Sequence, residues 1–171
     1  MPTLAEAVAV SPPKMQLTRL DDPSLILTAQ YNPEELSETG GAEYARQTVP
    51  GLSHKVKQFT HTKDRTLKFS LRFLAIDLGE SGCQSLVEAR EFIITSCYPR
   101  KSAGLVASGG APRMMFVWPN YFALMCVITD WSIKSQMFNT QGQLTDLMMD
   151  LTVEEIRDTL LTSDQFFVGV E

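Results

Sequence analysis

Histidines and cysteines are the side chains of this sequence best suited to catalysis or metal binding. The two histidines, His54 and His61, are seven residues apart, so on one strand their side chains would point to opposite faces. No serine, cysteine or carboxylate pattern around them resembles a nucleophile elbow or a helical metal motif. The sequence therefore predicts two surface histidines in a protein that is not an enzyme.

The cysteines and the glycine pairs carry no cofactor motif either. Cys83, Cys97 and Cys126 are odd in number and widely spaced, which encodes neither a disulfide framework nor a zinc site. We expect inert, partly buried thiols, because a free cysteine behaves as a small hydrophobic residue. The glycine pairs that begin at Gly40 and Gly109 lack the strand-to-helix context of a phosphate-binding loop, so we expect no cofactor.

The composition is that of one ordinary globular domain. The chain has 171 residues, of which 44% are hydrophobic and 20% charged, enough to bury a single core. The longest apolar run, Phe122 to Ile128, is too short to span a bilayer, and no positive charge precedes the mildly apolar N-terminus as a secretion signal requires. We expect a protein that stays in the cytoplasm and contacts no membrane. A net charge of −5 argues against general affinity for nucleic acid.

Alternating apolar residues predict most of the strands. Residues 15–20 and 25–31 flank the turn "DDPS" and predict a hairpin, and "RTLKFSLRF" at 65–73 alternates strictly between apolar and polar residues. Strands are also expected in "RMMFVW", in 122–138 and in 147–153. The apolar phase of 122–138 shifts between Ile128 and Trp131, which predicts a bulge there.

One helix is expected, from about Leu86 to Cys97. Ser85 and Glu88 have the spacing of a capping box, and Pro99 prevents further extension. One helix among about seven strands predicts a mainly β fold of the α+β kind, an antiparallel sandwich or a partly open barrel with a flanking helix. We expect a flexible N-terminal arm over 1–14, the domain over 15–156 and a C-terminal tail over 157–171.

The segment "YNPEELSETGGAEYARQTVPG", from Tyr31 to Gly51, is predicted to be a long polar connection. Hairpin loops need only about two to five residues, and connections beyond about twelve are usually functional or disordered. Tyr44 and Val49 are apolar but have no predicted strand or helix to bury them. Two interpretations stay open: a disordered surface loop, or a loop that docks on a neighbouring subunit and becomes ordered on assembly.

Two groups of charges alternate with apolar residues on predicted strands. Lys68 and Arg72 belong to a basic stretch that begins at Lys55, whereas Asp146, Asp150 and Glu154 line the polar face of the last strand. These charges are either solvated surface or faces through which adjacent copies meet.

The order of these motifs resembles the tube domain of contractile injection systems and contractile phage tails. The resemblance covers about residues 15–156 and depends on the opening hairpin that ends in "YNPEEL", then "VPGL", "KVKQF", "RTLKFSLRF", the helix, "PRMMFVW" and a terminal hairpin that closes on "LTVEEI". It implies a structural subunit that forms hexameric rings stacked into a hollow tube. Members of this kind often act as the tube initiator or adaptor at the baseplate, and some carry a peptidoglycan-binding LysM module.

The chain departs from the family pattern in two places. Pro119 stands in "FVWP" where a glycine after the tryptophan is common, and little sequence follows Glu155, so we expect no LysM module. The resemblance implies copies of the chain itself and adjacent tube, hub or baseplate rings as partners, with DNA or protein cargo passing through without specific binding. It implies cytoplasmic assembly followed by incorporation into a phage tail or an injection-system particle.

The predicted site residues form two sets. The subunit-interface set comprises Asn32, Pro33, Tyr44, Val49, Pro50, Gly51, Lys68 and Arg72. The lumen-facing set comprises Asp146, Asp150 and Glu154. Such an acidic face would fit a water-filled lumen through which polyanionic cargo slides without sticking. Two alternatives stay open: the main tube protein of the same machine, and a monomeric β-barrel that binds a small molecule.

Overall fold

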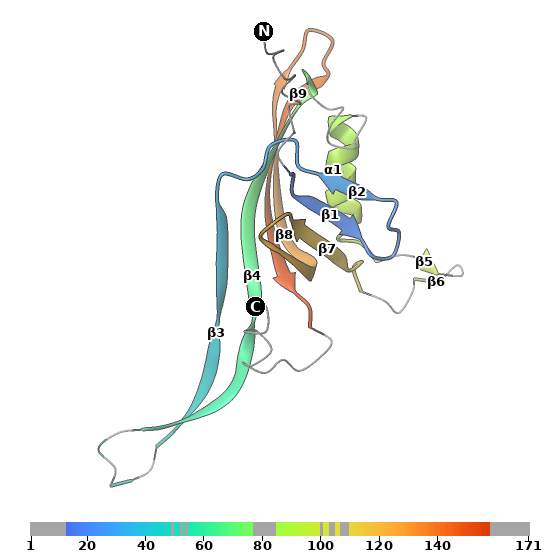
Figure 1. Ribbon diagram of the computed structural model, residues 1–171. Coiled ribbons are helices and arrows are strands. Elements are labelled where there is room, and N and C mark those ends of the chain that lie inside the picture. Colours follow the sequence, from blue (N-terminus) through green and yellow to red (C-terminus); the bar gives the residue numbers. More distant parts are fainter. Residues whose placement is uncertain are drawn as a thin grey trace, which may run out of the picture.

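A single antiparallel sheet dominates the structure (Figure 1), a computed structural model that describes residues 13–157 apart from 49, 52, 54, 77–84, 100, 103–104 and 107–109. Its seven strands have the order β2-β1-β7-β8-β9-β4-β3, and β5 and β6 form a separate ribbon. The prediction of a mainly β fold with one helix is confirmed. The elements are β1 Gln16–Arg19, β2 Ile26–Thr28, β3 Leu36–Gln47, β4 Val56–Leu74, α1 Leu86–Thr95, β5 Lys101–Ser102, β6 Leu105–Val106, β7 Met114–Trp118, β8 Phe122–Phe138 and β9 Leu144–Glu155.

The register of β4 and β9 follows from their alternating sequences. Leu67 pairs with Val153 and Leu71 with Met149, and all four side chains are buried. Side chains that alternate with these lie on the opposite, polar face of the sheet. A slip by one residue would expose the apolar set, so burial fixes this register.

The predicted bulge in β8 is confirmed. The pairing of β8 with β9 shifts register between Ile128 and Asp130. Before the bulge β8 also pairs with β7, from Phe122 to Cys126, whereas no pairing with β7 is seen beyond it. The second half of β8 therefore extends with β9 as a long hairpin.

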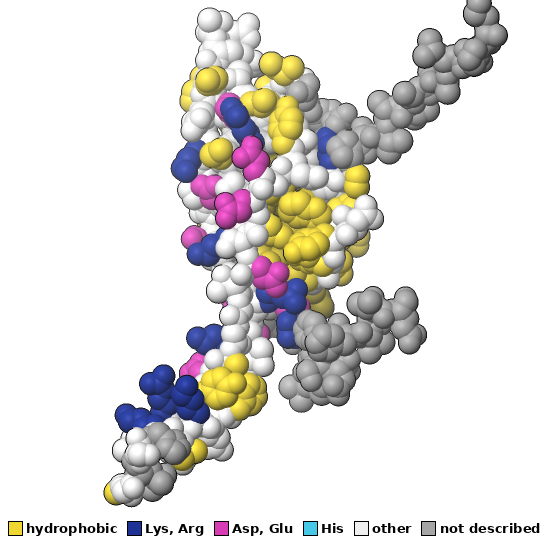
Figure 2. Space-filling view, turned by 60° about the vertical axis from the view of Figure 1, so that its left-hand side comes forward, with side chains coloured by type: hydrophobic (Ala, Val, Ile, Leu, Met, Phe, Trp, Pro, Cys, Tyr) yellow, Lys and Arg dark blue, Asp and Glu magenta, His cyan; other side chains and the backbone are white. Residues whose placement is uncertain are grey.

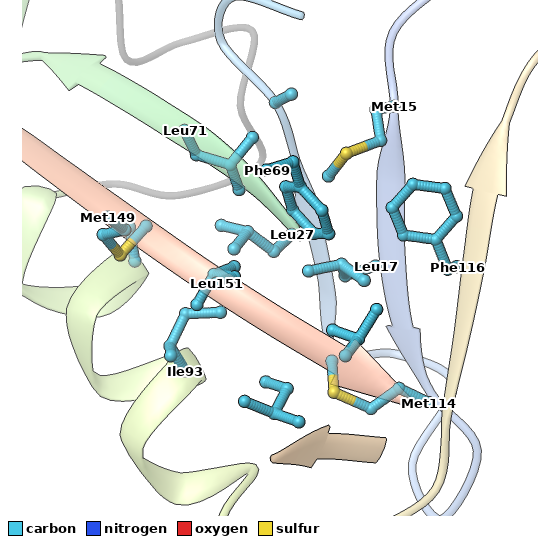
Figure 3. Packing of buried hydrophobic residues seen from close by; sticks show 14 of the residues in the cluster. Met15, Leu17, Leu27, Phe69, Leu71, Ile93, Met114, Phe116, Met149 and Leu151 are labelled. Carbon is cyan, nitrogen blue, oxygen red and sulfur yellow. The ribbon is translucent and has the colours of Figure 1, made fainter. Parts of the chain in front are cut away.

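The sheet curls over its own core. β2 and β3 are its two edge strands, yet residues 29–35 suffice to connect them. The side-chain amide of Gln30 donates to the carbonyl oxygen of Leu74 (3.1 Å) and accepts from the Leu74 N–H (2.5 Å), which brings the end of β2 against the end of β4. Figure 3 shows Leu17 and Leu27, from β1 and β2, packed with Phe69 of β4. Of the two arrangements expected, a sandwich or a partly open barrel, the structure has one open, curled sheet.

The single helix closes one side of this core. Ser85 caps α1, because its Oγ accepts from the N–H of Glu88 (3.2 Å), as the capping box predicts. Leu86, Ala89 and Ile93 are buried, and Ile93 points toward the strand that carries Leu151 (Figure 3). The helix ends at Thr95, two residues before the predicted end.

The prediction of an irregular connection from Tyr31 to Gly51 is wrong for most of its length. Leu36–Gln47 is β3, which pairs with β4 almost throughout. Apart from Leu36 every residue of β3 is exposed, so neither face requires apolar side chains and the period-two pattern is absent. β4 is likewise one strand from Val56 to Leu74, longer than the predicted segment.

In the described part of the chain, no helix combines the length and the hydropathy that a membrane span requires.

Candidate assembly interfaces

The distal part of the β3–β4 hairpin projects from the rest of the sheet (Figure 1). We call residues 40–47 and 56–63 the arm, and every one of them is exposed. The pairing in the arm shifts register between Thr39 and Gly41 and again between Glu43 and Tyr44. Each shift places an extra residue on one strand, and such bulges bend and twist a ribbon. The core gives the arm no support, so among the described residues only cross-strand pairs hold it.

One face of the arm combines aromatic rings with cations. Tyr44 is paired with Phe59, and their rings meet edge to face at 5.8 Å between centroids. The next pair on the same face is Arg46 with Lys57. Tyr44 and Phe59 are 52% and 56% exposed, which is unusual for two adjacent aromatic side chains in an isolated chain.

Asn32 and Pro33, predicted at the subunit interface, have roles within the chain. The Asn32 side chain accepts from the backbone N–H of Met15 (2.9 Å) and donates to the carbonyl oxygen of Pro13 (3.0 Å). It thereby fixes the start of the first strand. Pro33 is buried.

The predicted interface residues after β3 lie at the end of the arm. Pro50 and Gly51 are exposed, and Gly51 has φ +91°, a backbone conformation that favours glycine. Val49 and His54 lie outside the described residues. His61 is exposed and lies 3.6 Å from the carboxylate of Glu43 on the paired strand.

The two predicted charge sets share one face of one chain. Arg72 on β4 binds Asp146 on β9 through two contacts, Nε to Oδ1 at 3.2 Å and Nη2 to Oδ2 at 2.7 Å. The Asp146 side chain is only 4% exposed, whereas that of Arg72 is 52% exposed and covers it. The hydrogen bond from Arg72 lowers the pKa of Asp146 below its ordinary value, although burial opposes this shift.

Asp150 is held in the same way. It accepts from the Ser70 hydroxyl (2.6 Å) and from Lys134 Nζ on β8 (3.2 Å). These hydrogen bonds, that from Ser70 foremost, lower the pKa of Asp150. Arg72 and these aspartates are therefore already paired within the chain by the register of β4, β9 and β8, and a meeting of a basic and an acidic face between copies stays a prediction.

Lys68 and Glu154 lie farther along the same polar face. Lys68 is exposed, pairs with Thr152 in the register, and borders a groove of about 330 Å³ that Asp130 and Asp150 also line. Glu154 is half-buried opposite Thr66. We call this polar face of β8, β9 and β4 the polar wall. It carries both signs of charge and is not an acidic surface.

A second groove, which the sequence did not reveal, lies where the β2–β3 connection passes the end of β4. Its volume is about 560 Å³. Its lining comprises Tyr31, Asn32, Pro33, Glu34, Glu35, Ser70, Leu71, Arg72, Leu74 and Met148. Glu34 and Glu35 are exposed, so the groove has an acidic rim. The adjacent acids in "YNPEE" were the available signal, but their position beside β4 depends on the fold.

Besides the outer edge of β2, two strand edges on the other side of the sheet are unpaired in the described structure. β3 hydrogen-bonds to β4 alone, and β8 beyond Ile128 hydrogen-bonds to β9 alone. Together β8, β9, β4 and β3 form a four-stranded wall with an open edge on each side. Open edges favour pairing with another chain.

The described residues contain no group of three or more histidine, cysteine or acidic side chains that could hold a metal ion. Cys126 is buried, and burial raises the pKa of its thiol to about 12. Cys97 is half-buried, and burial raises its thiol pKa as well. Cys83 lies outside the described residues.

Comparisons with known proteins give one family. A family model described as the contractile injection system tube protein matches residues 8–160. Among solved structures, the chain is similar to a chain in the six-fold symmetrised cryo-EM structure of the anti-feeding prophage (AFP) baseplate, with 12% identity and a TM-score of 0.44. The alignment covers 92% of this chain and 95% of that one. No curated protein matches the sequence.

Proposed function

Because the chain belongs to the family of contractile injection system tube proteins, we propose that six copies of it close into a ring of the inner tube. Its role is then structural: the ring is one segment of a hollow conduit, and no chemical step is assigned to any side chain. The number six comes from the resemblance set out above, and the four-stranded wall supplies the physical support.

The observation that carries this proposal is the pair of open edges. The strands β8, β9, β4 and β3 alternate in direction, so β8 and β3 run in opposite senses. In a ring of equivalent copies, the β3 edge of one copy would lie beside the β8 edge of the next. The two strands would then be antiparallel, and the alternation would continue from copy to copy. A closed ring would leave neither of these two edges free, which lowers the aggregation risk of an open sheet.

The polar wall is the face best suited to the lumen. The opposite face of β9 and of the second half of β4 carries the buried core and α1, so the polar face of these two strands is the one left to meet water. Lys68, Arg72 and Lys134 lie among the acidic residues, and two of these cations bind carboxylates of their own chain. A wall with its charges paired would let DNA or protein cargo pass without specific binding.

Two positions along the tube are compatible with this role. The chain is either the initiator or adaptor ring at the baseplate, with hub and tube rings as its neighbours, or the main tube protein. One ring per particle would identify the adaptor, and many rings would identify the main tube. Assembly would occur in the cytoplasm before incorporation into a phage tail or an injection-system particle.

Native mass spectrometry and electron microscopy of the purified chain test the ring. We expect species of six copies across a range of concentrations, alone or after addition of neighbouring tube components, and six-fold symmetric images. A chain that stays monomeric under all these conditions and never enters particles contradicts the proposal. That result would favour the other alternative, a monomer that binds a small molecule, although the sheet is open and does not close into a barrel.

A further inference from the structure

No partner for the cation-bearing aromatic face of the arm is seen among the described residues of its own chain. Tyr44 and Phe59 contact each other edge to face, and neither has another ring contact in the described structure. Figure 2 shows Lys and Arg side chains gathered around a hydrophobic patch on the projecting end of the molecule. No ion pair is seen for Arg46 or Lys57 within the described residues, and both are exposed. An aromatic side chain buries about 150–250 Å² when it is fully enclosed, and about half of each of these two is still exposed.

The 560 Å³ groove has the complementary character. Leu74 and Met148, both half-buried, contribute apolar surface, and Glu34 and Glu35 contribute negative charge. The one cation in the lining, Arg72, is already bound to Asp146. The volume lies within the range of about 300–1,000 Å³ typical of sites that bury a ligand of several rings. The groove thus offers an apolar floor, and at its rim lie two carboxylates for which no ion pair is seen in the described part of the chain.

The arm and the groove lie at opposite ends of the same strand. Phe59 is near the start of β4, and Arg72 is near its end. Thirteen residues at about 3.3 Å each separate them by roughly 40 Å. An arm therefore cannot reach the groove of its own chain, and two copies related by a simple shift along the strand can join arm to groove. Such a heterologous contact does not close on itself and repeats along an axis.

We infer that the arm of one copy docks in the groove of a second copy in the adjacent ring, with Tyr44 and Phe59 against its apolar floor and Arg46 and Lys57 against Glu34 and Glu35. This inference rests on the proposed ring and names the contact that would stack one ring on the next. Aromatic burial would supply the affinity, and the opposite charges would select the correct end. A chain whose two ends fit each other in this way is suited to the repeated part of the tube.

Three variants of the full chain test the contact, each checked for folding by circular dichroism. Tyr44→Ser with Phe59→Ser removes the aromatic pair, and Arg46→Glu with Lys57→Glu reverses the arm charges. Both should leave single rings but abolish stacks, measured by sedimentation velocity and by stack length in negative-stain images. Combining the arm reversal with Glu34→Lys and Glu35→Lys should restore stacking, because both partners have then exchanged sign. The control is Gln58→Glu on the other face of the arm, which should stack normally.

The outcomes separate this inference from the ring proposal. Stacks of normal length in the aromatic variant, or no recovery in the combined variant, overturn the docking contact and leave the ring intact. Rings of the unaltered chain that never stack on one another also overturn it, and favour the adaptor position. Absence of rings in the unaltered chain overturns the ring proposal, and the docking inference fails with it.

Discussion

At the residue scale, the most informative contact is the ion pair between Arg72 and Asp146. Both residues were expected to face other molecules, yet they bind each other across β4 and β9. A nearly buried carboxylate needs such a partner, because an unpaired buried charge is costly. The polar wall is therefore held partly by its own charges, and fewer of them are left for contacts between copies.

This pair makes stability depend on pH. The pKa of Asp146 is lowered in the folded state, so its ionised form stabilises the fold above the ordinary aspartate pKa of about 3.9, and the contribution is lost as pH falls through the lower, folded value. Asp146→Asn should therefore unfold at a lower temperature than the unaltered chain at pH 7. The difference should shrink as the pH falls below about 3.9. Thermal unfolding of both proteins from pH 2 to pH 7 measures this, and equal melting temperatures at pH 7 would contradict it.

The buried thiol of Cys126 should be unreactive. Burial raises its pKa to about 12, so almost no thiolate is present near neutral pH, and the thiolate is the reactive form. We expect iodoacetamide at pH 8 to leave Cys126 unmodified in the native protein and to label it after denaturation. Peptide mass spectrometry reports the site. Rapid native labelling would show that β8 opens locally.

At the element scale, α1 contributes to the core through one face. Ile93 is fully buried, whereas Val87 on the same helix is 51% exposed. The two positions therefore allow one substitution to be compared inside and outside the core.

Ile93→Asp should destabilise the domain by several kcal/mol, about 3–5, because it buries a charge without a partner. That is enough to unfold a domain of ordinary stability. Val87→Asp is the matched control and should be nearly neutral, since an acidic side chain in the first turn of a helix is favourable. Chemical denaturation measures both. Unchanged stability of the Ile93 variant would show that this side chain is not in the core.

The arm is the second informative element. It is a two-stranded ribbon exposed on both faces, and isolated hairpins are only marginally stable in water. That this segment docks on a neighbouring subunit remains a proposal about assembly. Its structure is a strand and not the expected loop, because β4 continues far enough to pair with it. Replacing residues 37–48 would therefore remove an edge strand of the sheet as well as the arm, so point substitutions on the arm face are the cleaner test.

At the scale of the whole molecule, charge distribution bears on the choice of partner. The net charge is −5, yet the arm and the start of β4 are basic. We propose that this basic surface contacts acidic protein surface on neighbouring copies and not nucleic acid. Lys68 is included, because on the polar wall it lies beside β3, the strand at the seam with the next copy.

Lys68→Glu tests the choice between these partners. Lys68 is exposed, so the variant should fold with nearly unchanged stability, but assembly with neighbouring copies should weaken. Arg72 is unsuitable for this test, because its loss would leave Asp146 unpaired. Neither the unaltered chain nor the Lys68 variant should bind DNA at about 0.15 M salt, because charges are screened beyond a Debye length of about 8 Å. Tight, salt-sensitive DNA binding that the variant loses would contradict the proposal.

The sequence by itself determined two things: the single helix, and the strands that pack on the core. In β4 and β9 the alternation of apolar and polar residues shows which face of each strand packs on the core. The spacing of Ser85 and Glu88 shows where α1 begins. The shift in the apolar pattern after Ile128 likewise indicates the bulge in β8. Each of these signals is local, because each arises from the contact of one short segment with a single apolar surface.

Only the tertiary structure decided which distant residues meet. β3 has no apolar face and is stabilised by pairing along β4, so nothing in its own sequence marks it as a strand. The ion pair between Arg72 and Asp146 depends on the register between β4 and β9, two strands that are far apart in the sequence. The groove depends on the passage of Pro33 and Glu34 beside Leu71. Periodicity tells which face of a strand is buried, but the neighbours of its polar face are set by strand order and register, which arise from packing the whole chain around one core.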